Sequence, residues 1–242
     1  MLAEMMLESA AAMGIAMTRA QAEQFEQYHA MLTEANRQFN LTRVPDELRE
    51  AADRNYLDCI APLAHGWPEG VESLVDVGSG AGFPGIPLSI MLPQTHVVMV
   101  DSLDKRVKFL QSVIDALGLN AEAVHARAED AARRPELRER FDMAVARAVA
   151  PMCVLCEYLL PFVRVGGRML ALKGPSVEDE LSEAARAVSA LGGRVDRVEA
   201  VAIPGRDWSH RLACIDKAAP TPKQYPRKAG VPEKKPLIAT KS

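Results

Sequence analysis

The sequence predicts an α/β domain with a mostly parallel sheet and helices on both faces, preceded by a helical extension. From Val71 onward, buried strand patterns alternate with helical patterns, which is typical of a parallel sheet covered on both sides. A glycine-rich run follows the first of these strands, at the sheet edge where α/β folds bind ligands. We expect three segments, namely a helical extension over 1–66, the α/β domain over 67–219 and a basic, proline-rich tail over 220–242.

The composition supports a sizeable core and excludes several classes of protein. The 242 residues are 48% hydrophobic and 25% charged. No apolar run approaches the roughly 18 residues that span a bilayer, and the first residues carry glutamates where a secretory signal carries basic ones. We therefore expect a cytoplasmic protein without a membrane partner, whose cysteines are reduced thiols. The cysteines are Cys59, Cys153, Cys156 and Cys214.

The N-terminal extension has a helical pattern. Thr18 and Gln21 have the spacing of a capping box, which predicts that a helix begins there. The apolar residues that follow at helical spacing are Phe25, Tyr28, Leu32, Ala35 and Phe39. We interpret this stripe as packing surface. The prolines and glycines between residues 62 and 70, Gly66 among them, predict a linker to the domain.

The elements of the domain follow in order. Strands are expected at 73–77, 96–101, 121–126, 141–149 and 167–173, and at 194–203 and 211–217 as a closing hairpin. Helices are expected at 86–91, 103–117, 155–162 and 176–192. Gly118 should end the second of these helices in a left-handed conformation, and Ser176 should cap the last one.

The glycine loop, from Asp76 to Pro87, does not match a dinucleotide fingerprint. Its glycines have GxGxG spacing at positions 78, 80 and 82, whereas a dinucleotide site needs a third glycine at the position of Phe83. Two prolines at 84 and 87 remove N–H groups that would otherwise bind a pyrophosphate. The loop is therefore a poor phosphate cradle, which disfavours NAD and FAD.

A cofactor without phosphates, carrying a cationic sulfonium, fits this loop better, which indicates S-adenosylmethionine. The glycines permit close approach of the backbone, and Asp76 supplies a carboxylate beneath the loop. Asp101 ends the second strand, where it is placed to accept both ribose hydroxyls. The alternative is that Asp101 and Ser102 cap the following helix. After the third strand, Ala128 and Glu129 offer an apolar wall and a backbone amide for an adenine.

The runs DVGSGAGFPGIPLSI, DSLDKRVKFL, RAED, VARAVA and GGRMLALKG resemble those of the ribosomal RNA small-subunit methyltransferase G family, also called glucose-inhibited division protein B. The likeness runs from NLTRV, at residues 40–44, into the tail. It implies a Rossmann-like class I S-adenosylmethionine-dependent methyltransferase fold. It also implies methyl transfer to N7 of a guanosine in small-subunit (16S) ribosomal RNA.

The resemblance implies a set of site residues. The expected cofactor-binding residues are Asp76, Gly78, Gly80, Gly82, Phe83, Asp101, Ser102, Leu103, Ala128, Glu129 and Arg147. Arg147 is also the expected catalytic residue beside the reacting groups. Residues 54–59 read Arg-Asn-Tyr-Leu-Asp-Cys where the family has Arg-His-x-x-Asp-Ser, which leaves the roles of positions 55 and 59 open.

The implied reaction needs positioning more than proton transfer. Guanine N7 has a free lone pair, so no general base is required. We expect Arg147 to bind the O6 edge of the guanine or a phosphate. The alternative is an ion pair with Asp142 or Glu129. No metal is expected, because the histidines are scattered and Cys153 with Cys156 has the pattern of a helix core.

The charge distribution suggests where RNA could bind. Residues 220–242 hold six Lys/Arg against Glu233, a net +5, whereas the rest of the chain carries −8. This predicts an extended, mobile tail that contacts RNA, although a solubilising terminus explains the charge equally well. Further predicted RNA contacts are Arg37, Arg43, Arg54, Lys105, Arg106 and Lys108, the last three with the alternative of a solvated helix face.

Two other functions fit parts of the pattern. One is methylation of a small molecule, since the cofactor half is shared between substrate classes. The other is a non-enzymatic factor that binds the small ribosomal subunit during its assembly. The sequence leaves the oligomeric state open, with a monomer as the working expectation.

Overall fold

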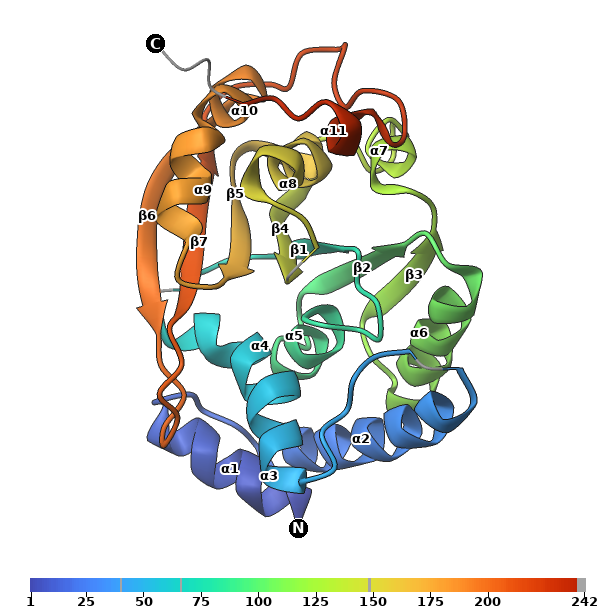
Figure 1. The fold of residues 1–242 in the computed structure, drawn as a ribbon. Helices are drawn as coiled ribbons and strands as arrows, with labels where there is room; N and C mark the ends of the chain where they lie inside the picture. Colours follow the sequence, from blue (N-terminus) through green and yellow to red (C-terminus); the bar gives the residue numbers. More distant parts are fainter. Residues whose placement is uncertain (40, 66, 148, 239–242) are drawn as a thin grey trace.

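The computed structural model describes residues 1–39, 41–65, 67–147 and 149–238. Within these ranges a seven-stranded sheet has the order β3-β2-β1-β4-β5-β7-β6 (Figure 1). The strands are β1 (Ser73–Val77), β2 (His96–Asp101), β3 (Ala121–His125), β4 (Phe141–Arg147), β5 (Val163–Lys173), β6 (Gly193–Val201) and β7 (His210–Lys217). The first five are parallel, and β7 lies antiparallel between β5 and β6. The sheet therefore confirms the predicted α/β architecture.

The strand bounds follow the sequence pattern closely. The predictions for β1 and β2 agree with the structure at both ends. The prediction for β5 began at residue 167, whereas the strand begins at Val163, because the two glycines at 166 and 167 do not interrupt it. Of the predicted strand 141–149, β4 covers Phe141 to Arg147, and Ala148 lies outside the described residues.

Helices cover both faces of the sheet. They are α1 (Leu2–Ala12), α2 (Arg19–Phe39), α3 (Leu48–Ala51), η1 (Ala52–Leu57), α4 (Asp58–Ile60), η2 (Ala61–Ala64), α5 (Gly85–Met91), α6 (Asp104–Leu117), α7 (Ala128–Ala131), α8 (Met152–Leu159), η3 (Leu160–Phe162), α9 (Val177–Glu183), α10 (Ala185–Ala190) and α11 (Val231–Lys234). In the described ranges, none of them is long and apolar enough to cross a membrane.

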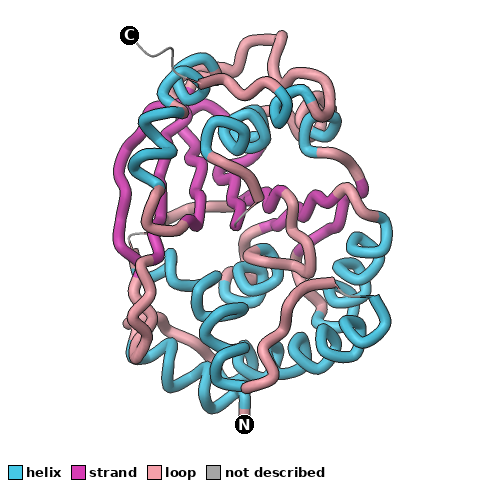
Figure 2. The backbone as a smooth tube through the Cα atoms, in the orientation of Figure 1, coloured by secondary structure: helices cyan, strands magenta, loops and turns pink. Residues whose placement is uncertain are grey.

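Two apolar cores lie on opposite sides of the sheet, because successive side chains of a strand point to opposite faces. Leu74 packs with α2, α5 and α6 on one side. Val75 packs with α8 on the other. Figure 2 shows the helices as two groups separated by the strands. Cys153 and Cys156 are buried in the second core, as the helix-core interpretation predicted.

The N-terminal helices pack directly against the sheet domain. Thr18 and Gln21 form the predicted capping box, with Thr18 N–H donating to Gln21 Oε1 at 2.8 Å and Gln21 N–H donating to Thr18 Oγ1 at 3.2 Å. Phe25, Tyr28 and Leu32 are fully buried, which confirms the stripe as packing surface; the side chain of Phe39 and the linker residue Gly66 lie outside the described residues. The division into three segments stays a prediction.

Two helix-end predictions have different outcomes. Gly118 ends α6 in the left-handed region, at φ 62°, as predicted. Ser176 precedes α9, but its side chain makes no capping hydrogen bond. The predicted helix 176–192 is also divided, since α9 ends at Glu183 and α10 begins at Ala185.

The prediction of an extended, mobile tail is wrong for residues 220–238. Arg227 binds both carboxylate oxygens of Glu157, at 3.0 and 2.7 Å, and Glu157 is fully buried on α8. Arg138 donates to the carbonyl oxygens of Thr221 and Tyr225. The prediction rested on net charge and prolines, and neither shows that the buried Glu157 binds Arg227 of this segment. Residues 239–242, with Lys241, lie outside the described residues.

Candidate active site

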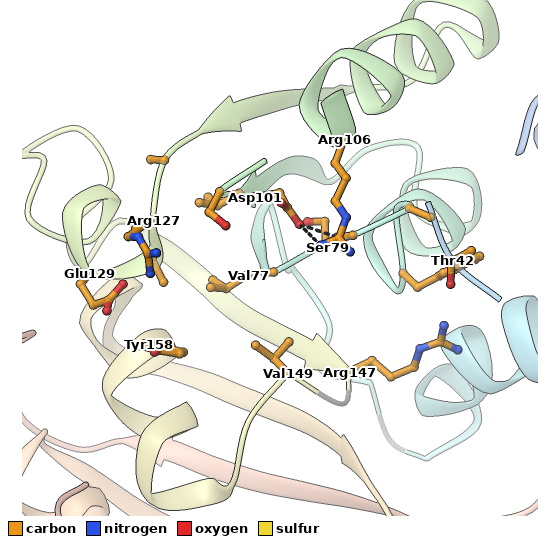
Figure 3. A pocket seen from close by; sticks show the side chains of 18 of the residues that line it. Thr42, Val77, Ser79, Asp101, Arg106, Arg127, Glu129, Arg147, Val149 and Tyr158 are labelled. Atoms are coloured by element: carbon orange, nitrogen blue, oxygen red, sulfur yellow. Dashed lines mark hydrogen bonds and ion pairs between the residues drawn. The ribbon is translucent and has the colours of Figure 1, made fainter. Parts of the chain in front are cut away.

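A cavity of about 490 Å³ lies at the carboxyl ends of β1, β2 and β4, a volume within the usual range for small-ligand sites (Figure 3). The predicted cofactor residues that line it are Gly78, Gly80, Phe83, Asp101, Ser102, Ala128, Glu129 and Arg147. Those that do not line it are Asp76, Gly82 and Leu103. Figure 3 shows Glu129 and Tyr158 at one end of the cavity, and Arg147 and Thr42 at the other.

The backbone N–H groups of the glycine loop are occupied inside the protein. Gly78 and Ser79 donate to the carbonyl oxygen of Val100, at 2.8 and 3.3 Å. Gly82 and Phe83 both donate to the carbonyl oxygen of Ser79. A phosphate at this loop would have to displace these bonds. The structure thus gives a physical reason why the loop is a poor phosphate cradle.

Gly82 has a packing role. Its φ is +108°, and a Cβ built on it would lie 2.6 Å from Ile86 Cγ1 and 2.9 Å from Tyr28 Oη. Tyr28 comes from α2 and donates its hydroxyl hydrogen to the carbonyl oxygen of Ala81 at 2.6 Å. The glycine therefore allows α2 to approach the loop from behind.

Asp76 lies beneath the loop and faces away from the cavity. The carboxylate is fully buried, and its Oδ2 accepts the N–H of Gly85 at 2.9 Å, which anchors the first turn of α5. A Cβ at Gly85 would lie 2.7 Å from that oxygen, so position 85 has no room for a side chain. Burial raises the pKa of Asp76 to about 7. Asp76 Oδ1 has no hydrogen-bond partner among the described residues.

Asp101 connects the glycine loop to the start of α6. Its Oδ2 accepts the N–H of Gly80 and its Oδ1 accepts the N–H of Leu103, both at 2.9 Å. Leu103 thus binds Asp101 through its backbone N–H, and its side chain does not line the cavity. A carboxylate has about four acceptor positions, and Arg106 Nη1, 3.4 Å from Oδ2, takes a third, so one remains for a hydroxyl group in the cavity. The N-terminus of α6 has no side-chain cap, so the capping alternative is not borne out, and the ribose interpretation stays a prediction.

Arg106 is a cavity residue that the sequence interpretation assigned to RNA. It reaches back from the first turn of α6, so that Nη1 lies 3.4 Å from Asp101 Oδ2. Its Nε is a buried donor without a hydrogen-bond partner among the described residues. A ribose hydroxyl both donates and accepts, so the carboxylate and this free donor together suit a ribose. The residues present therefore fit a nucleoside cofactor without phosphates.

The other end of the cavity is formed by segments distant in sequence. Glu129, on α7, accepts the N–H of Gly230 at 2.7 Å and so holds the C-terminal segment in place. Tyr158, on α8, donates its hydroxyl hydrogen to Glu233 at 3.1 Å, and both residues line the cavity. Sequence patterns did not identify Tyr158 or Glu233, because only the tertiary fold brings them to the wall.

Arg147 ends β4 at the opposite end of the cavity. Nη1 donates to the carbonyl oxygen of Arg54 at 2.6 Å and lies 3.4 Å from Asp58 Oδ2. The guanidinium carbon lies 4.7 Å from the centroid of the Phe83 ring. The ion pair with Asp142 or Glu129, considered from the sequence, is wrong, since Asp142 pairs with Arg164 at 2.7 Å and Glu129 binds Gly230.

A second cavity, of about 440 Å³, adjoins the first, and the two share Thr42 and Arg147. Asp58 and His210 line it, and His210 Nδ1 lies 2.7 Å from Asp58 Oδ1. The hydrogen bond that the His210 ring donates to this carboxylate raises the pKa of His210. Asp58 therefore holds His210 through one oxygen and Arg147 through the other.

The basic residues predicted to contact RNA have different positions. Arg43 and Arg54 are exposed and line the second cavity. Arg54 pairs with Glu50 at 2.6 Å, Lys108 pairs with Asp104 at 2.7 Å, and Arg37 pairs with Glu34 at 3.0 Å. The RNA role of these residues stays a prediction.

Comparisons with known proteins agree with this geometry. The model of the family described as rRNA small subunit methyltransferase G matches residues 21–208. A ribosomal RNA small subunit methyltransferase G from Lactobacillus johnsonii is 44% identical over 97% of this chain and 99% of its own. One from Pelotomaculum thermopropionicum is 45% identical over 98% and 99%.

Solved structures share the fold at low sequence identity. Aeropyrum pernix fibrillarin, in complex with natively bound S-adenosyl-L-methionine, has a TM-score of 0.50 and 20% identity, covering 68% of this chain and 75% of its own. The likeness confirms the predicted Rossmann-like class I fold.

Proposed function

The chain belongs to the rRNA small subunit methyltransferase G family, and on this premise we propose that it transfers a methyl group to N7 of a guanosine in small-subunit RNA. It is an S-adenosylmethionine-dependent rRNA methyltransferase. The observation that carries the proposal is the pair of adjoining cavities, which share the wall at Arg147 and Thr42. One cavity suits the methyl donor, and the other can admit an acceptor base.

In this proposal the first cavity binds the cofactor along its length. Gly78 and Gly80 allow close approach of the backbone, and Asp101 with Arg106 binds the ribose hydroxyls. Ala128 and its neighbours form the adenine end. Arg147, at the boundary with the second cavity, would then lie at the end of the site next to the acceptor. Bound S-adenosylmethionine supplies the electrophilic methyl group.

The chain's own residues would act by position and charge. The lone pair of N7 attacks directly, so the acceptor needs alignment rather than deprotonation. The purine gains positive charge as it reacts, which a cation nearby would oppose and a carboxylate would favour. Asp58 lies 3.4 Å from Arg147 and so offsets the charge of the guanidinium beside the reacting groups. Arg147 can then bind guanine O6 or a phosphate.

Replacement of Arg147 tests its proposed role. Arg147→Ala should lower methyl transfer to unmodified small subunits by roughly 10- to 100-fold, because it removes hydrogen bonds from a charged donor. Affinity for the cofactor should change much less. Arg147→Lys should recover only part of the rate, since an ammonium lacks the planar donor fork. Near-wild-type turnover of Arg147→Ala would contradict the role.

Product mapping tests the proposed acceptor atom. Borohydride and aniline cleave RNA at N7-methylguanosine, so treated small-subunit RNA should show strand scission that depends on the enzyme and on the cofactor. Labelled cofactor supplied with ribosomal RNA or with a metabolite extract separates RNA from small-molecule acceptors. An RNA acceptor also makes the cytoplasm the expected compartment. A monomer stays the working prediction, which sedimentation analysis checks.

A further inference from the structure

The second cavity carries a donor that no described residue satisfies. Asn55 lies on the π-helical turn η1, a conformation that is common at functional sites. Its side chain lines the cavity and is 5% exposed. The amide nitrogen Nδ2 has no hydrogen-bond partner among the described residues. An unpaired buried donor is costly, so the position is expected to serve a ligand.

Two charged neighbours of Asn55, Asp58 and Arg147, are already paired. Asp58 binds His210 and Arg147, and Arg147 also binds the carbonyl oxygen of Arg54. Beside these paired charges, the Asn55 amide is a neutral donor without a partner among the described residues. A neutral donor suits a neutral acceptor such as a base carbonyl.

The outer part of the cavity suits a phosphate. Arg43 and Arg54 are both exposed and line it. Trp208 lies beside this rim, with the guanidinium of Arg54 4.9 Å from its ring centroid and the ring of His210 5.2 Å away. A nucleotide turned out of its stack would place its phosphate among these cations and its base inside. The arrangement of charges thus predicts the orientation of the nucleotide, with its phosphate at the outer part of the cavity and its base inside.

We propose that the second cavity receives the acceptor guanine and that the Asn55 amide donates a hydrogen bond to guanine O6. Rotation about the last side-chain torsion, which is broad for Asn, points the amide into the cavity. A single donor on O6, with the phosphate left to Arg147, keeps the adjacent N7 lone pair free, whereas a bidentate Arg would occupy both atoms. This inference rests on the proposed function.

Two substitutions test the hydrogen bond. Asn55→Ala removes the donor, and Asn55→Asp keeps the shape while it replaces the donor by an acceptor. Both should lower kcat/KM for unmodified small subunits by roughly 5- to 30-fold, the range for loss of one or two hydrogen bonds. Asn55→Asp should be the slower of the two, and the Kd for S-adenosylhomocysteine should stay within about twofold. Asn120→Ala, beyond the opposite edge of the strands, is the matched control.

Nucleotide discrimination separates recognition from a structural role. With S-adenosylmethionine present, guanosine 5′-monophosphate should inhibit wild-type methylation of small subunits more strongly than 2-aminopurine riboside 5′-monophosphate, which lacks O6. The two nucleotides should inhibit Asn55→Ala equally. A variant that merely unfolds would instead lose cofactor binding and thermal stability, which Asn55→Asp should keep.

The results distinguish this inference from the proposed function. If the variants keep wild-type kcat/KM, or if Asn55→Ala still prefers the nucleotide with O6, the assignment of Asn55 is overturned even where N7-methylguanosine is formed. If the product is not N7-methylguanosine, the proposed function fails first, and the nucleotide that the wild type prefers identifies the base that the second cavity binds.

Discussion

Asp76 is a buried carboxylate that anchors the fold beneath the glycine loop. The residue sits at the end of β1, directly below the glycine loop, and its carboxylate is closed off from solvent. One oxygen anchors α5 through Gly85, and the other lacks a partner among the described residues. Desolvation disfavours the charged form, which is why the pKa rises to about 7.

This burial makes stability depend on pH in a predictable direction. The pKa of Asp76 is 3.8 in an ordinary environment and about 7 in the folded protein. Between these values the folded state holds a proton that the unfolded state releases, so the free energy of unfolding decreases as pH rises from about 4 to 7. The full effect is about 4 kcal/mol. Asp76→Asn cannot ionise and should not show this loss.

Urea denaturation of the cofactor-free protein at several pH values measures the effect. The stability of Asp76→Asn relative to wild type should increase by about 4 kcal/mol between pH 4 and pH 8. The comparison removes the contributions of the other titrating groups, which both proteins share. Parallel pH profiles would show that Asp76 is ionised at low pH in the folded state.

The residues predictable from sequence are those whose role is local. Asp101 could be placed at the cavity because it ends a strand next to the glycine loop. Arg106 could not, since its direction depends on how α6 packs, and Asn55 could not, since its unpaired amide exists only in three dimensions. The assignment of Asp76 to the cofactor stays a prediction, and the sequence could not show that this carboxylate is buried and outside the lining of the cavity.

At the scale of elements, α2 supports the glycine loop from behind. Tyr28, Tyr56 and Phe83 form an aromatic cluster with ring centroids 5.7 to 6.1 Å apart. Tyr28 also reaches the loop backbone through its hydroxyl. The N-terminal helices therefore influence the cofactor site although they contribute few of its walls.

Tyr28→Phe tests this support. It keeps the ring and removes the hydrogen bond to the buried carbonyl of Ala81, which should lower the free energy of unfolding by about 1–2 kcal/mol. Cofactor affinity should also fall several-fold, because the loop loses one of its fixed points. Calorimetry with S-adenosylhomocysteine measures both quantities.

Tyr56→Phe is the matched control for Tyr28→Phe. Tyr56 belongs to the same cluster, but its hydroxyl binds His29, at 2.7 Å, and not the loop. The Tyr56→Phe variant should have a lower free energy of unfolding and an unchanged affinity for the cofactor. Equal effects of the two variants on affinity would show that the cluster acts only through general stability.

Strands and long helices were predictable because their periodicity is local, whereas short and composite elements were not. β1 and β2 agree at both ends, since continuous apolar runs mark buried parallel strands. η1 gives no sequence signal, because a π-helical turn differs from an α-helix only in its hydrogen bonds. The path of residues 218–238 depends on long-range ion pairs that no window of sequence contains.

For the molecule as a whole, the C-terminal segment closes one end of the cofactor cavity. It places Glu233 in the wall beside Tyr158, and Glu129 holds it through Gly230. Arg227 fastens it to the fully buried Glu157 of α8. The basic residues of the segment therefore include at least one that packs against the domain, besides those expected to contact RNA. Net charge alone does not distinguish these two roles.

Two neighbouring substitutions separate packing from RNA binding. Arg227→Ala leaves the buried carboxylate of Glu157 without its partner, which should cost about 3–5 kcal/mol of stability and lower the melting temperature by roughly 10 °C. Affinity for the cofactor should decrease as well, because the segment forms part of the cavity. Lys228→Ala removes an equal charge from an exposed position and should leave both unchanged. If the two variants instead lose the same RNA affinity and neither loses stability, the segment acts as the RNA-binding tail that its charge suggests, and its contacts with α8 contribute little.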